Sequence, residues 1–178
     1  MNSGTAEVNA NLVTTDNPYV FGTLGGTGSL TWTSANPAYI QGTINPGTSS
    51  STAILNLEDI AYQGSSSNNF TVLLNGTTAG TQHDQLNVTG TVVLAGNLNV
   101  SLGVGYTPNV NDTFTILNND GTDAISGTFN GLPGGGLVNF GGNIFQINYF
   151  GGMNNNDIVL STLAINHFCS RWDEIPAP

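Results

Sequence analysis

One short acidic segment contains the residue types that a hard cation binds. Residues 118–123, Asn-Asn-Asp-Gly-Thr-Asp, place the carboxylates of Asp120 and Asp123 and two amide side chains around a glycine. Ca²⁺ takes about six to eight oxygen ligands, and carboxylate and amide oxygens are its usual protein ligands. The segment lacks the frame and closing glutamate of an EF-hand, and its alternative interpretation is an Asp-Gly turn. We expect Asn118, Asp120 and Asp123 to bind Ca²⁺.

A second segment also matches a calcium motif in part. Residues 151–158 follow the order of the nonapeptide G-G-x-G-x-D-x-U, which binds Ca²⁺ in β-helical repeats. Asn156 stands where the motif has aspartate, and Asp157 is displaced by one position. The alternative is a turn built from asparagines, which tolerate a left-handed backbone. Asn156 and Asp157 join the expected calcium ligands.

Nucleophilic catalysis has little support in the residue pattern. The chain contains no Gly-x-Ser-x-Gly elbow and no lysine. His83 and Asp84 are the pair nearest to a general base and its partner. Neighbouring side chains on a strand point to opposite faces, so this pair could cooperate only at a turn. A Ser/His/Asp set would need His83 or His167 as its base, so His83 and Asp84 are the catalytic candidates, and the pattern favours a non-catalytic chain.

The charge balance excludes several classes of partner. The chain has eleven Asp and Glu, one basic residue (Arg171) and a formal net charge of −10. Nucleic acids and anionic lipid surfaces need clustered Lys or Arg, which are absent. No apolar run approaches the ~18 residues of a membrane span, so direct membrane insertion is not expected. We expect cations, glycans, small neutral ligands or cell-surface proteins as partners.

Aromatic side chains offer a route to glycan binding by stacking. The aromatic residues considered for this role, with ordinary core packing as the alternative, are Trp32, Tyr39, Tyr62, Tyr106, Tyr149 and Phe150.

The elements that must position these residues are short strands. Charged residues make up only 7% of the chain, and Gly, Asn, Ser and Thr replace them, which favours tight turns and strands over helices. Apolar and polar residues alternate in several segments, and we expect Leu86, Val88, Val92, Leu94, Leu98, Val100, Phe114 and Ile116 to point into one core. Strands are expected at Val20–Leu24, Ser29–Thr33, Tyr39–Ile44, Ala53–Leu57, Phe70–Leu74, Gln85–Val88, Thr91–Leu94, Leu98–Leu102, Thr113–Leu117, Gly127–Phe129, Asn143–Tyr149 and Ile158–Thr162.

An internal repeat indicates how the strands are connected. The tripeptide Gly-Thr-apolar begins at Gly22, Gly42, Gly90 and Gly127. The first two copies lie 20 residues apart, which is about one turn of a β-solenoid, and the later spacings are irregular. The repeat therefore predicts an all-β fold, a β-solenoid. The alternative is a β-sandwich with Gly-Thr turns.

Several segments resemble one family of bacterial surface proteins. The chain is similar to the C-terminal part of autotransporter passengers built from autotransporter-associated β-strand repeats. The likeness is strongest from Gln82 to Leu160, and the matching segments, in the family's order, are Ile40–Gly47, Asp84–Val92, Gly105–Pro108, Asp112–Leu117, Ser126–Phe129 and Asn156–Leu160. Asn111 stands where the family motif usually has glycine. As a second departure from the family, we expect no outer-membrane β-barrel to follow and no direct anchoring.

The resemblance implies a secreted or cell-surface location and no catalytic residues. It also implies a right-handed parallel β-helix that ends in an irregular, β-rich C-terminal cap. Residues 164–178 contain the only Cys and the only Arg and share no repeat pattern with the rest, so we expect one β-helical domain over residues 1–163 and a loosely ordered tail over residues 164–178. The expected function is a spacer, display or adhesion module that Ca²⁺ stabilises. The alternatives are a calcium-dependent hydrolase of small esters or lactones and a glycan-binding module. The polar start at Met1 carries no signal peptide, so any export signal is expected elsewhere.

Overall fold

β-Strands are the only regular elements in residues 4–63 and 67–164, the part of the chain that the computed structural model describes. One sheet has the spatial order β1 (Thr5–Val8), β4 (Thr23–Gly26), β7 (Thr43–Pro46), β10 (Asn69–Leu74) and β13 (Asn97–Leu102). A second contains β12 (Val92–Val93), β9 (Ile60–Tyr62), β6 (Ala38–Ile40) and β3 (Tyr19–Val20). The third and largest has the order β15 (Leu137–Phe140), β16 (Asn143–Gly151), β17 (Asp157–Leu163), β14 (Thr113–Asn119), β11 (Gln85–Val88), β8 (Ile54–Leu57), β5 (Ser29–Trp32) and β2 (Asn11–Thr14).

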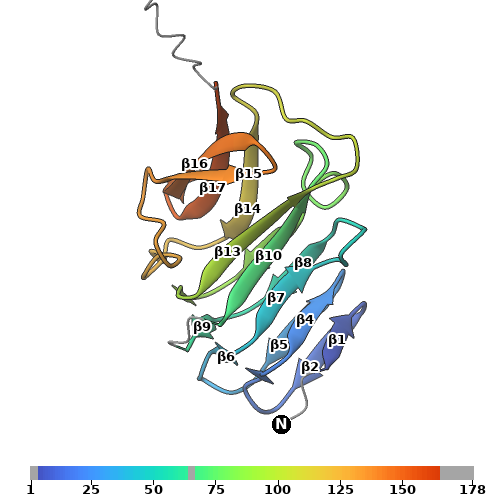
Figure 1. Ribbon diagram of the computed structural model, residues 1–178. Helices are drawn as coiled ribbons and strands as arrows, with labels where there is room; N and C mark the ends of the chain where they lie inside the picture. Colours follow the sequence, from blue (N-terminus) through green and yellow to red (C-terminus); the bar gives the residue numbers. More distant parts are fainter. Residues whose placement is uncertain (1–3, 64–66, 165–178) are drawn as a thin grey trace, which may run out of the picture.

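From β1 to β14 the chain visits the three sheets in turn. Each strand pairs in parallel with the strand three elements later, so β4 pairs with β7 and β11 pairs with β14. Figure 1 shows β1, β4, β7, β10 and β13 side by side in the order of the sequence. The Gly-Thr-apolar repeat sets this register, because Thr23 and Leu24 pair with Thr43 and Ile44. The β-sandwich alternative required antiparallel hairpins around Asn87–Val100, whereas β11, β12 and β13 all pair in parallel.

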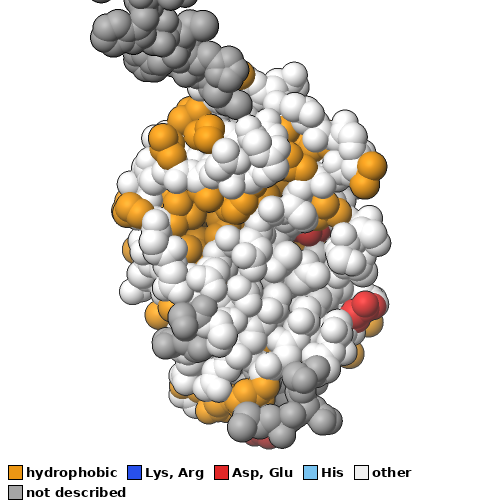
Figure 2. Space-filling view, in the orientation of Figure 1, with side chains coloured by type: hydrophobic (Ala, Val, Ile, Leu, Met, Phe, Trp, Pro, Cys, Tyr) orange, Lys and Arg blue, Asp and Glu red, His pale blue; other side chains and the backbone are white. Residues whose placement is uncertain are grey.

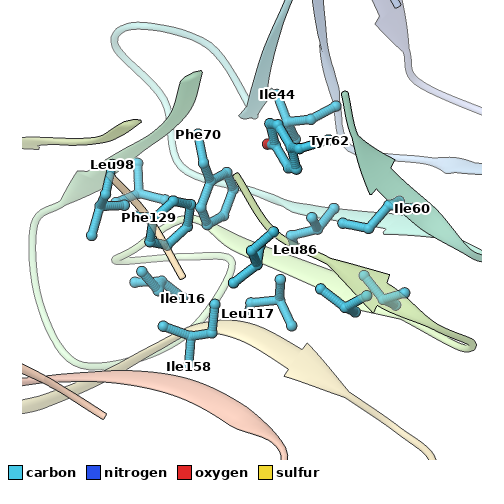
Figure 3. Close-up of a cluster of buried hydrophobic side chains, with 14 of the residues drawn as sticks. Ile44, Ile60, Tyr62, Phe70, Leu86, Leu98, Ile116, Leu117, Phe129 and Ile158 are labelled. Atoms are coloured by element: carbon cyan, nitrogen blue, oxygen red, sulfur yellow. The ribbon is translucent and has the colours of Figure 1, made fainter. Parts of the chain in front are cut away.

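The interior is one apolar cluster, as the alternation predicts. Inward-facing side chains from all three sheets meet there (Figure 3). Seven of the eight residues expected in the core are buried, and Val100, on the edge strand β13, is half-buried against them. Removal of this surface from water is the main stabilising contribution to the fold.

Glycines turn the chain at the corners between sheets. The expected strands Val20–Leu24 and Tyr39–Ile44 are each interrupted in the middle, at Gly22 and Gly42. A Cβ on Gly42 would collide with the carbonyl oxygen of Gly22, and a Cβ on Gly22 would collide with that of Gly4. Glycine at these corners therefore lets successive turns of chain approach closely.

The expected strand at Gly127–Phe129 does not form. Gly127 has a φ of 82°, outside the β region, and only the neighbouring Ser126 makes an isolated bridge, to Val93. The chain turns away here instead of adding another strand beside β13.

The corner contact makes a testable prediction. Gly42→Ala should destabilise the protein by about 1–3 kcal/mol, because the added methyl group forces two backbone segments apart. Urea unfolding followed by circular dichroism measures the change. Gly4→Ala is the matched control, since Gly4, like Gly42, has no positive φ but has no atom within 4 Å of the added Cβ. If Gly42→Ala has no effect on stability, the close stacking at this corner is wrong.

An antiparallel cap ends the largest sheet. β14 pairs with β17 in an antiparallel arrangement, β17 with β16, and β16 with β15. Figure 1 shows these strands at the end of the molecule opposite the N-terminus. The tail expected at residues 164–178 lies, after Ala164, outside the described residues. No segment of the described chain could cross a membrane as a helix.

Candidate cation site at the cap

A polar cavity lies where β14 ends and β16 turns into β17. Its volume is about 290 Å³. The lining residues come from both calcium-like segments of the sequence: Asn118, Asn119, Asp120, Met153, Asn154, Asn156 and Asp157. The antiparallel pairing of β14 with β17 brings together segments that are more than thirty residues apart in the chain.

A ladder of asparagines positions Asn118. Asn56, Asn87 and Asn118 pair in register on β8, β11 and β14. Asn87 Nδ2 donates to Asn56 Oδ1 at 2.9 Å, and Asn118 Nδ2 donates to Asn87 Oδ1 at 3.4 Å. The ladder therefore engages the amide nitrogen of Asn118 and not its oxygen.

Three further amides use their nitrogens in the same way. Asn154 and Asn156 donate to the Gly121 carbonyl at 3.1 and 2.7 Å, and Asn119 donates to the Asp123 carbonyl at 2.7 Å. The bonds from Asn154 and Asn156 join the loop after β14 to the β16–β17 turn, and the bond from Asn119 closes that loop back on the end of β14. An amide whose nitrogen is held by a carbonyl has its oxygen left for another partner.

Asn119 and Asp157 carry the strongest evidence for a ligand. Asn119 is 2% exposed, and its Oδ1 atom is buried without a hydrogen-bond partner. Asp157 is 8% exposed and accepts a hydrogen bond from the Asn119 backbone N–H at 3.0 Å. Burial raises the pKa of Asp157, and the bond from Asn119 opposes that shift. A bound cation would supply a partner for both groups.

The turn itself depends on two special backbone positions. Gly152 and Asn155 have φ of 71° and 56°, in the left-handed region. A Cβ on Gly152 would also collide with the Asp157 carboxylate. The tight turn explains why Asp157, displaced by one position from the nonapeptide motif, nevertheless reaches the cavity.

Four of the five expected calcium ligands line this cavity: Asn118, Asp120, Asn156 and Asp157. Asp123 is not among the lining residues; its backbone carbonyl accepts the bond from Asn119, and its carboxylate lies near Gly121. Asn119 and Asn154 were missed, although both belong to the asparagine runs that drew attention to the segments. The described residues contain no group of three or more His, Cys, Asp or Glu arranged for a metal. Binding here would rest on two carboxylates and amide oxygens, a donor set that suits Ca²⁺.

His83 and Asp84 lie inside the protein and bond to different backbone segments. Asp84 accepts hydrogen bonds from the Ala53 and Leu73 N–H groups at 2.9 and 2.8 Å. The ring nitrogens of His83 lie 3.1 Å from the Gly76 carbonyl and 3.3 Å from that of Thr115. Both side chains are buried, so they hold the loop between β10 and β11 against its neighbours rather than facing a substrate.

The aromatic candidates for glycan binding divide by burial. Trp32, Tyr62 and Tyr149 belong to the core, Tyr39 and Tyr106 are half-buried, and Phe150 is exposed. Two exposed aromatics were not singled out by the sequence pattern: Tyr19, which lies beside Tyr39, and Phe21, which lies beside Tyr19.

Comparisons of the chain with protein-family models, curated protein sequences and solved structures find no match.

Proposed function

We propose that this chain is a non-catalytic, right-handed parallel β-helix module of a secreted or cell-surface bacterial protein. The module serves as a spacer, a display scaffold or an adhesion element. The observation that carries the proposal is the threefold alternation of the chain among parallel sheets, with one apolar interior. Such a stack can be lengthened one turn at a time, which suits a spacer. The resemblance to autotransporter passengers supports the bacterial surface location.

The absence of catalysis is proposed from the described residues alone. Within them His83 is the one histidine, and it is buried. The described range contains no Lys or Arg, so anionic substrates have no counter-charge there. Figure 2 shows one face with few acidic and no basic side chains. A surface of this kind suits neutral or cationic partners and disfavours nucleic acids.

The cap cavity is proposed to bind Ca²⁺ and to stabilise the end of the stack. Asp120 is exposed at its mouth, and Asp157 is buried within it. The two carboxylates lose part of their mutual repulsion when a cation binds. The same cation would hold the loop after β14 against the β16–β17 turn, so binding favours the folded cap.

The melting temperature tests the calcium proposal. A free Ca²⁺ concentration a hundredfold above Kd should stabilise the fold by about 2.7 kcal/mol, and a chelator should reverse the gain. Asp120→Asn should remove most of this response, because the variant loses one of the two carboxylates of the cavity. Asp123→Asn is the matched control and should keep the response, since the Asp123 carboxylate does not line the cavity. A melting temperature that neither Ca²⁺ nor a chelator changes would contradict a calcium-stabilised cap.

The same variants separate the spacer from a calcium-dependent ester or lactone hydrolase. The full chain with Ca²⁺ should hydrolyse p-nitrophenyl acetate and γ-butyrolactone no faster than buffer does. Calcium-dependent turnover that disappears in Asp120→Asn but persists in Asp123→Asn would support the hydrolase and overturn the non-catalytic function.

A further inference from the structure

Three aromatic rings lie together on the outer face of the sheet formed by β3, β6, β9 and β12. Tyr19 and Phe21 are 56% and 48% exposed, whereas most large apolar side chains of the chain are buried. The centroid of the Tyr19 ring lies 6.1 Å from that of Phe21 and 5.0 Å from that of Tyr39. Tyr19 contacts both other rings, stacked on Phe21 at 15° and tilted by 43° from the half-buried Tyr39, so the three rings form an apolar surface outside the core.

The strand register extends this surface in two uncharged rows. The first row follows the strand pairing: Tyr19 pairs with Tyr39, Tyr39 with Ala61, and Ala61 with Val93. The Gln41 N–H donates to the Val20 carbonyl and the Gln63 N–H to the Ile40 carbonyl, which continues the register by one position.

Phe21, Gln41 and Gln63 therefore form the second row. The Gln41 side-chain amide donates to that of Gln63 at 3.4 Å, so both side chains lie on the same face. Neither row contains an acidic or basic side chain. The two rows combine ring faces with neutral amides, which can both donate and accept hydrogen bonds.

A hollow adjoins the rings. A cavity of about 340 Å³ is lined by Pro18, Tyr19 and Phe21 on one side and by residues of β1 and β4 on the other. Its polar lining includes Thr5 and Thr23, which pair in register on those strands. The hollow is therefore mostly apolar, with two threonines among its lining residues.

We infer that the surface formed by Tyr19, Phe21, Tyr39, Gln41 and Gln63 binds a neutral glycan. The C–H face of a sugar ring is apolar and packs on aromatic rings, while its hydroxyl groups exchange hydrogen bonds with amides and hydroxyls. Charge complementarity favours a neutral ligand: the two rows are uncharged, and the acidic chain offers anionic sugars no counter-charge among the described residues. The site lies in the first turns of the stack, far in sequence from the cap, and is independent of the calcium proposal.

Affinity electrophoresis of the full chain tests this inference. Gels would contain hydroxyethyl cellulose, laminarin or galactomannan, with polygalacturonate as the anionic comparison. At least one neutral polysaccharide should retard the protein, and polygalacturonate should not. Tyr19→Ala and Phe21→Ala should each weaken the apparent affinity roughly two- to tenfold. Tyr19→Leu, which keeps apolar volume but removes the ring, should weaken it as well.

Two controls show whether binding belongs to this surface. Phe150→Ala removes an exposed ring in the cap and should leave retardation unchanged, and circular dichroism should show that every variant is folded. The inference is overturned if none of the three neutral polysaccharides retards the protein, or if Phe150→Ala weakens binding as much as Tyr19→Ala. Retardation that millimolar choline chloride abolishes would also overturn it, because the rings would then prefer a cation.

Discussion

Phe114→Ala is expected to destabilise the protein by about 3–5 kcal/mol. Phe114 is fully buried on β14, where the parallel stack meets the antiparallel cap. Its ring contacts His83 edge-on at 5.6 Å between centroids and Phe145 of β16 at 6.2 Å. Alanine would leave a cavity between the stack, the loop between β10 and β11, and the cap, and a loss of this size is a large part of a domain's stability.

Urea unfolding at constant pH measures this loss, with Phe150→Ala as the matched control. Phe150 is an aromatic residue of the same cap but 67% exposed, so its truncation should change stability by no more than about 0.5 kcal/mol. Equal effects of the two substitutions would show that the junction is not packed around Phe114.

Asp84→Asn should lower the free energy of unfolding by about 2–4 kcal/mol, because it disturbs the hydrogen bonds of two buried backbone N–H groups at once. The Asp84 carboxylate accepts from Ala53 N–H, before β8, and from Leu73 N–H, within β10. Asparagine keeps the shape but offers only one acceptor oxygen and turns an NH₂ group toward the other N–H. Thr89→Ala, just after β11, removes a polar group from an exposed position and should lower the free energy of unfolding far less.

The effect of Asp84→Asn should depend on pH with a definite sign. Burial raises the pKa of Asp84 from 3.8 to about 7, although the two N–H bonds oppose the shift. The folded state therefore binds the Asp84 proton more tightly than the unfolded state does. The stabilisation is fully present below pH 3.8 and is lost as the pH rises through about 7.

His83 makes stability depend on pH in the opposite direction, so the comparison needs a background in which His83 is replaced. Burial lowers the pKa of His83 below 6.5, and its stabilisation is lost as the pH falls through that range. In a His83→Gln background, the loss of stability caused by Asp84→Asn should be largest near pH 4 and shrink by pH 8. A loss that grows with pH would mean that the ionised carboxylate is the stabilising form.

The strand content and the interior of this fold could be predicted from local pattern. Alternation along Phe70–Leu74 and Leu98–Leu102 identified the inward side chains because a strand has a period of two. The corners could not be predicted, since glycine is needed at positions 22 and 42 because the preceding turn of chain passes close to them, and local pattern does not show that contact. The first strands were missed as well: β1 and β2 have exposed side chains and form by pairing with β4 and β5.

The cap cavity was predictable in its residues but not in its assembly. Asn118, Asp120, Asn156 and Asp157 stood out because oxygen-rich turns suit Ca²⁺. That the two turns share one cavity follows from the antiparallel pairing of β14 with β17, which no local motif encodes. The aromatic surface could not be predicted from the sequence for a similar reason. Tyr19 and Tyr39 meet only through the parallel register of β3 and β6, and strand alternation alone does not say which face is outside.

Disulfide cross-linking in register tests the parallel three-sheet stack most directly. In a Cys169→Ser background, cysteine pairs would be placed at Thr71 and Asn99, at Asn56 and Asn87, and at Tyr39 and Ala61, which are directly paired in the three sheets. Adjacent strands lie about 4.8 Å apart, within the Cα separation that a disulfide spans. All three pairs should oxidise to a cross-linked form, seen as a shift on non-reducing electrophoresis and by mass spectrometry. A pair at Asn87 and Asn99, which lie in different sheets, should remain reduced, and preferential cross-linking of that pair would contradict the parallel stack.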